Sequence, residues 1–340
     1  MTVPKQTTAS KIVSKSLNKV EGTLSRSVVF VVIIIATAVL FAGNLFLTGL
    51  AGNPEMSRGL FIRGISEVSR EFPLNITPAG FTFAIWGVIY FLQIGWILYS
   101  LGLICRTTED GPAYLNPIIL SPAYFLYFNA STLAVTAWLF MWDRLLFIAA
   151  FVFLALVVTS LVMTVTAGAS SLARHRSELI DQGRGLDVKI LTVFMVNGVS
   201  MYATWTSIAT LINLATLLVY RLISPFTNET ASILCLSILA CLLVLYTVLD
   251  STVLKPYNRY NFAPYATVIW ALIGVLAKNL DLANISSIIS IALLVGTSAV
   301  FLAKLVNAVL RFVSLEQYEY KQMRFGRVVT PIPEKKEIGL

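Results

Sequence analysis

Long apolar runs alternate with short polar segments along most of this chain. Each run is close to the roughly 20 residues that a helix needs to cross the hydrocarbon core of a bilayer. The pattern predicts about eight membrane-spanning helices, over 28–50, 79–103, 118–140, 145–168, 196–220, 231–253, 262–279 and 286–312. The fold class that follows is an all-α polytopic membrane protein, with every backbone hydrogen bond made inside a helix.

Composition agrees with this class. The 340 residues are 57% hydrophobic and 12% charged, whereas a soluble domain has about a quarter charged residues. The net charge of +8 comes mostly from loops and tails. Basic residues are expected there in a membrane protein, so no nucleic-acid partner is predicted, and membrane lipid is the expected surrounding.

The distribution of basic residues predicts the orientation. An even number of spans places both termini on one side, which then holds 18 Lys and Arg against six on the other. Cytoplasmic loops carry such an excess. We therefore expect an integral multi-pass protein with both termini in the cytoplasm: a basic segment over 1–27 and a tail over 313–340. Asn-x-Ser/Thr triplets at Asn75, Asn228 and Asn284 fall on the predicted outer side.

The residues of common catalytic and metal sites are sparse. His175 is the only histidine, and Cys105, Cys235 and Cys241 have no metal-like spacing. Buried Ser and Thr need an adjacent base to act as nucleophiles, and the spans offer none. The sequence therefore predicts no enzyme, no catalytic residue, no metal site and no cofactor.

Two predicted helices carry aromatic and small side chains that lipid contact alone would not require. Trp86 and Tyr90 lie one turn apart and share a helix face. Trp205, Ala209 and Asn213 form a second stripe at positions i, i+4 and i+8. Such stripes are typical either of a ligand pocket between helices or of close helix packing with an Asn as interhelical hydrogen-bonding group.

These motifs resemble the tryptophan-rich sensory protein family, which includes the translocator protein (peripheral benzodiazepine receptor). The similarity covers about residues 28–220, and the segment 77–83 looks like the longer branch of that family. In the second helix a Trp is followed four residues later by a Tyr, here Trp86 and Tyr90. The pattern of the fifth helix is matched by Tyr202, Trp205, Ala209, Leu211 or Ile212, and Asn213. The aromatic end of the third helix is matched by Trp138, Phe140 and Trp142.

The resemblance implies a five-helix bundle with a pocket for a lipophilic ligand, such as a porphyrin or a sterol, under the first loop. Carried over residue by residue, it implies a ligand-binding set of Trp86, Tyr90, Trp205, Ala209, Ile212 and Asn213. The chain departs from the family at Ala84, where the family has a proline. It also carries a loose sterol-type pattern, Leu254-x-x-Tyr257-x-Arg259, outside the resembling region.

The expected organisation is a translocator-like bundle over 28–220, followed by three additional helices over 221–312 that could serve a homodimer or a membrane partner. The loop 51–78 is expected to act as a lid, and 169–195 to be a charged inner loop. The alternative function is a secondary transporter or channel using the last three helices, with Lys304 and Asn307 facing a water-filled path shared with Asn197 or Asn129. Against that alternative, Lys304 is expected to extend to the lipid headgroups.

Overall fold

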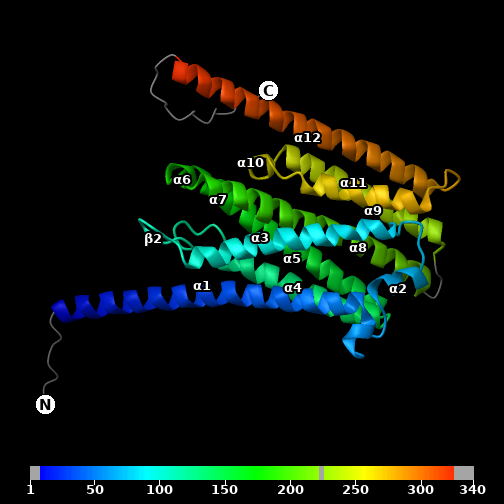
Figure 1. Cartoon of the computed structure of the whole chain (residues 1–340), viewed down its shortest axis with the longest axis horizontal. Coiled ribbons are helices and arrows are strands. Elements are labelled where there is room, and N and C mark those ends of the chain that lie inside the picture. Colours follow the sequence, from blue (N-terminus) through cyan, green and yellow to red (C-terminus); the bar gives the residue numbers. More distant parts are fainter. Residues whose placement is uncertain (1–7, 222–225, 325–340) are drawn as a thin grey trace.

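The computed structural model describes residues 8–221 and 226–324, and they are almost entirely helical. The long helices run roughly along one axis (Figure 1), and both the start of the first and the end of the last point toward the same end of the bundle. We call this the tail end and the opposite one the lid end. The long helices are α1 (Thr8–Gly52), α3 (Ile85–Ile104), α4 (Pro122–Asp143), α5 (Phe147–Arg174), α8 (Gly198–Tyr220), α9 (Asn228–Ser251), α11 (Ala263–Asn279) and α12 (Ile285–Arg324).

Within the described residues, seven helical segments are long and apolar enough to cross a membrane. They coincide with seven of the predicted runs, so the polytopic all-α class is confirmed. They are Ser27–Gly52, Gly80–Ile104, Pro122–Asp143, Phe147–Arg174, Gly185–Tyr220, Asn228–Ser251 and Ile285–Arg311. The remaining run forms α11, which has 17 residues and at 1.5 Å per residue reaches about 26 Å.

The predicted inner loop over 169–195 is wrong, because this segment is largely helical. It contains the end of α5, then α6 (Arg176–Asp181), α7 (Gly185–Ile190) and the start of the π-helical turn η3 (Leu191–Asn197) that leads into α8. Asp187 holds the segment in place through ion pairs with Arg184 at 2.8 Å and Arg106 at 3.0 Å. Pairing with Asp187 raises the pKa of Arg106. Because the segment holds many charged residues, its low hydropathy favours a loop. In the structure these side chains pair with one another, so the segment can be helical.

The centre of the bundle is held by α3, α4, α5 and α8. Trp96 on α3 is fully buried and meets Tyr124 and Phe128 of α4 edge to face, with ring centroids 5.2 and 4.8 Å apart. Edge-to-face pairs add to the free energy gained by burying the rings. The helices α4 and α5 form a tight antiparallel hairpin joined by residues 144–146, with Leu145 in the left-handed region at φ 57°.

The later helices are joined closely to the first five. Thr82 lies in the 3-10 turn η2 (Gly80–Ala84), and its carbonyl accepts a hydrogen bond from Trp270 Nε1 of α11 at 2.8 Å. Ala79 N donates to the carbonyl of Gly274 at 2.9 Å. At the tail end, Asn197 Oδ1 accepts from the amide nitrogens of Phe262 and Ala263, where α11 begins. Three independent contacts therefore fix α11 against the bundle.

Gly274 is the point of closest approach between α11 and η2. A Cβ added there would meet Thr82 Oγ1 at 2.0 Å. We therefore expect Gly274→Ala to lower the free energy of unfolding by about 1–3 kcal/mol, as overpacking does. The measurement is thermal unfolding in detergent. Gly296→Ala in α12, where nothing lies within 4 Å, is the matched control and should be neutral or slightly stabilising. Equal melting temperatures for the two variants would contradict this packing.

Candidate ligand-binding cavity

A cavity of about 280 Å³ lies near the lid end, between α1, α3, α4 and α8. Its walls are mainly aromatic, because four tryptophans reach it from three helices: Trp86, Trp138, Trp142 and Trp205. Trp86 and Trp205 meet edge to face at 6.4 Å, while Trp138 and Trp142 are stacked at 5.9 Å. The volume is just below the range typical of small-molecule sites, about 300–1,000 Å³.

All six residues that the resemblance implies for ligand binding line this cavity. Trp86 and Tyr90 of α3 are stacked on each other at 5.4 Å, and Trp205, Ala209, Ile212 and Asn213 face them from α8. Trp205 is 3% exposed, so its ring points into the protein and away from lipid. The helical periodicity places each set on one face, and the packing of α3 against α8 brings the two faces together.

Several lining residues were missing from the predicted set. Trp138 and Trp142 belong to the aromatic helix end of the family resemblance, and their four-residue spacing puts them on one face of α4. Trp138 Nε1 donates to Asn213 Oδ1 at 3.2 Å, and Asn213 Nδ2 donates to the carbonyl of Ala209 at 3.0 Å. Asn213 is thus held in a fixed orientation by α4 and by its own helix, which no local pattern shows.

Among the residues that the structure describes, no Asp, Glu, Lys, Arg or His lines the cavity. Its polar side chains are neutral: Thr48, Ser66, Ser69, Thr77, Tyr90 and Asn213. Moving an uncompensated charge into such a space costs several kcal/mol, whereas a hydroxyl costs little if it finds a partner. The cavity is therefore suited to an uncharged molecule with few polar groups.

The segment 51–78 covers the cavity as a lid. It contains η1 (Pro54–Ser57) and α2 (Ile65–Glu71), and Ile65, Ser66 and Ser69 of α2 line the cavity directly. Asp143 at the end of α4 latches the lid, because its Oδ1 accepts from the amide nitrogens of Ile62 and Arg63 at 2.7 and 2.6 Å.

Aromatic stacking supports the latch. The ring of Phe61 in the lid stacks on Phe140 of α4 at 4.9 Å, and Trp142 Nε1 donates to the carbonyl of Ile65 at 3.3 Å. Arg144 pairs with the second oxygen of Asp143 at 2.6 Å. The lid is therefore attached to α4 by charge-assisted hydrogen bonds and ring contacts, which together hold the roof of the cavity in place.

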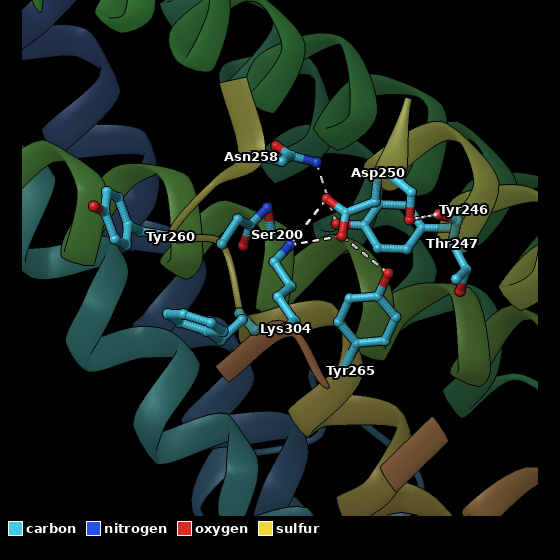
Figure 2. A network of polar contacts seen from close by, with 12 residues as sticks. Ser200, Tyr246, Thr247, Asp250, Asn258, Tyr260, Tyr265 and Lys304 are labelled. Atoms are coloured by element: carbon cyan, nitrogen blue, oxygen red, sulfur yellow. Dashed lines mark hydrogen bonds and ion pairs between the residues drawn. The ribbon is translucent and has the colours of Figure 1, made fainter. Parts of the chain in front are cut away.

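The expectation that Lys304 extends to the headgroups is wrong. Its Nζ lies 2.7 and 2.9 Å from the two carboxylate oxygens of Asp250 on α9, and the two side chains are only 13% and 7% exposed. Tyr265 of α11 donates to the same carboxylate at 3.0 Å (Figure 2). A buried charge needs a partner, and the packing of α9 against α12 supplies one that lies 54 residues away in the sequence.

Three of the four residues suggested for a transport path have other roles or positions in the structure. Lys304 is neutralised by Asp250. Asn197 uses its carbonyl oxygen to cap α11 and its amide nitrogen to bind the carbonyls of Thr192 and Tyr260. Asn307 is exposed on the surface of α12. Lys304 and Asn197 therefore hold helices together and Asn307 faces outward. Asn129, the fourth of these residues, has a buried Oδ1 without a hydrogen-bond partner within the described residues.

Helices that span the membrane, an internal aromatic cavity and a lid define a polytopic membrane protein with a hollow inside its helix bundle. The chain belongs to the TSPO-like protein family, whose model matches residues 30–306. The match confirms the family resemblance and extends it past residue 220, through α9 and α11 into α12. No curated protein and no solved structure gives a significant match.

Proposed function

We propose that this protein binds a compact, uncharged lipophilic molecule in the cavity beneath the lid, without converting it chemically. The observation that carries the proposal is the convergence of Trp86, Tyr90, Trp205, Ala209, Ile212 and Asn213 on one hollow. Flat aromatic walls provide a large apolar contact area, and a few fixed polar groups provide orientation, which is the usual division of labour in ligand pockets.

Charge favours a sterol-like ligand over a porphyrin. The carboxylates of a porphyrin require cations, and the cavity wall offers none. A single hydroxyl, by contrast, can meet Ser66 or Ser69 of α2, while the apolar body contacts the tryptophans. The volume of about 280 Å³ also favours a compact ligand, with entry through movement of the lid.

The same features support binding over catalysis. The hydroxyls on the cavity wall have no carboxylate or imidazole beside them in that wall, so no base is positioned to activate them. We further propose that the lid faces the outside and both termini face the cytoplasm, a proposal supported by the excess of basic residues in the loops and tails of the tail end.

Filling the cavity tests the proposal. In wild-type protein in nanodiscs, dehydroergosterol should accept energy from the cavity tryptophans in a saturable way. Ala209→Phe, which places a ring in the hollow, should weaken this binding at least tenfold, because the ring takes up space that the ligand would fill. The readout is the titration of tryptophan emission, with protoporphyrin as a second probe.

Val244→Phe is the matched control, since Val244 is 65% exposed on the surface of α9 and does not line the cavity. It should bind the sterol as the wild type does. Unchanged binding by Ala209→Phe would overturn the assignment of the cavity. Saturable binding of protoporphyrin without any binding of the sterol would overturn the ligand class.

A further inference from the structure

The lid returns to the bundle through residues 72–78, which we call the return segment, and α9 binds it. The side chain of Asn75 donates to Glu229 Oε2 at 2.8 Å, and the amide nitrogen of Asn75 donates to Asn228 Oδ1 at 2.9 Å. Asn228 Nδ2 in turn donates to the carbonyl of Pro73 at 3.1 Å. Both acceptors lie in the first turn of α9, so the start of this helix holds the return segment by its backbone and by a side chain.

Glu229 also joins the lid to α12. Its Oε1 accepts from the amide nitrogen of Ser286, the second residue of α12, at 2.7 Å, and its Oε2 accepts from Ser286 Oγ at 2.7 Å. Like Asn75 Nδ2, these partners are donors, and a carboxylate accepts at both of its oxygens. Among the described residues, no Lys or Arg forms an ion pair with Glu229. The carboxylate therefore connects the lid, α9 and α12 through hydrogen bonds.

The return segment forms part of the cavity wall. Thr77 and Pro78 line the cavity, and Thr77 follows Asn75 by two residues. The carbonyl of Thr77 accepts from Asn279 Nδ2 of α11 at 2.9 Å. Ile76 is 5% exposed, so the segment is packed as well as hydrogen-bonded. Contacts with α9, α11 and α12 therefore set the position of two wall residues.

The two ends of the lid are held differently. Residues 58–64 at its start are held to α4, by the carboxylate of Asp143 and by the stacking of Phe61 on Phe140. Displacing them requires breaking these contacts with α4. Displacing the return segment requires breaking hydrogen bonds to α9 and α11, and it also removes a partner of the carboxylate that holds the start of α12. The start of the lid is therefore the end that can open with fewer changes in the bundle.

We propose that Glu229 is a positioning residue for the cavity: it fixes the return segment, so that the lid opens at residues 58–64 only, beside α4. The inference rests on the proposed function where it concerns entry of a ligand, whereas the one-sided movement is a property of the lid itself. It gives the later helices a role in the site, although no described residue of α9, α11 or α12 lines the cavity.

Two reversible crosslinks test the side on which the lid opens, with a short bifunctional methanethiosulfonate in nanodiscs. Two exposed native cysteines are first replaced by Ser: Cys105 and Cys241. Phe61→Cys with Phe140→Cys ties the start of the lid to α4, and association of dehydroergosterol should become about tenfold slower until the link is reduced. Phe72→Cys with Tyr220→Cys is the matched control, because these rings also touch, at 5.1 Å against 4.9 Å, but the link ties down the return segment. It should leave association unchanged. Slow association with the second link, or fast association with the first, would overturn the proposal.

Hydrogen exchange in nanodiscs tests Glu229 without any ligand. Glu229→Ala should make amide exchange over 74–77 about tenfold faster, since one hydrogen bond to a carboxylate is worth about that factor. Exchange over 58–64 should stay as in the wild type. Glu178→Ala removes an exposed carboxylate of α6 and is the matched control for both segments. Unchanged exchange over 74–77 in Glu229→Ala, or equal acceleration of the two segments, would contradict the proposal.

A double variant distinguishes positioning from a general loss of stability. In Asn75→Asp with Glu229→Gln the donor and the acceptor change places, so the hydrogen bond can form again with the same net charge. This variant should restore slow exchange over 74–77. It should also restore slow release of dehydroergosterol, which Glu229→Ala accelerates about tenfold because the lid then opens at both ends. Fast exchange over 74–77 in the double variant would refute the assigned role of Glu229.

The result for the lid is separate from the result for the cavity. If the wild-type protein does not take up dehydroergosterol, the proposed function is wrong, and exchange over 74–77 and 58–64 still decides whether Glu229 fixes the return segment. If the sterol binds but the link at Phe61 leaves association fast, the cavity assignment stands and the one-sided opening is wrong.

Discussion

Replacing Lys304 with Met should lower the free energy of unfolding by about 3–5 kcal/mol, the cost of leaving one member of a buried ion pair alone. In this protein the group left behind is the carboxylate of Asp250, which is 7% exposed and keeps the hydrogen bond from the hydroxyl of Tyr265. Thermal or denaturant unfolding in detergent micelles measures the change. The effect is large because α12 contacts α9 and α11 through few polar groups, and this pair is the only ion pair that joins them within the described residues.

A second substitution distinguishes a lost pair from lost packing. The double variant Asp250→Asn with Lys304→Met removes both charges, so most of the stability should return. Lys278→Met is the control for removing an exposed lysine near the opposite end of the bundle, and it should change stability by less than about 0.5 kcal/mol. A single variant as stable as the wild type would mean that Lys304 reaches the headgroups after all.

Removing the carboxylate of Asp143 should release the lid. Asp143→Ala deletes the acceptor for two amide nitrogens, those of Ile62 and Arg63, and the partner of Arg144. Hydrogen bonds to a charged acceptor contribute about 1.5–3 kcal/mol each. We expect amide hydrogen exchange over 58–64 to become about 10- to 100-fold faster, and exchange of a ligand in the cavity to accelerate with it.

Asp281→Ala provides the comparison, because Asp281 also accepts a backbone amide, that of Ala283, in another loop at the lid end. It should leave exchange over 58–64 unchanged. Unaltered exchange in Asp143→Ala would mean that the ring contact between Phe61 and Phe140 closes the lid without the carboxylate.

Much of the architecture follows from the sequence alone. In lipid, a chain must satisfy its backbone hydrogen bonds within each segment, so the apolar runs predict the helices directly. The helical repeat also places Trp86 with Tyr90, and Trp205 with Ala209 and Asn213, on shared faces. The candidate cavity could therefore be proposed before any packing was known, since a face is a property of one helix.

Contacts between helices could not be predicted in the same way, because they join residues far apart in the chain. Trp138 meets Asn213 across 75 residues, and Lys304 meets Asp250 across 54. From the sequence alone, Asp250 would be placed at the membrane interface and Lys304 would extend to the lipid headgroups, without an ion pair between them. Only the packing of α9 against α12 places the two at one depth. The tertiary structure likewise decided that the charged segment 169–195 is helical, because Asp187 pairs there with arginines from two different elements.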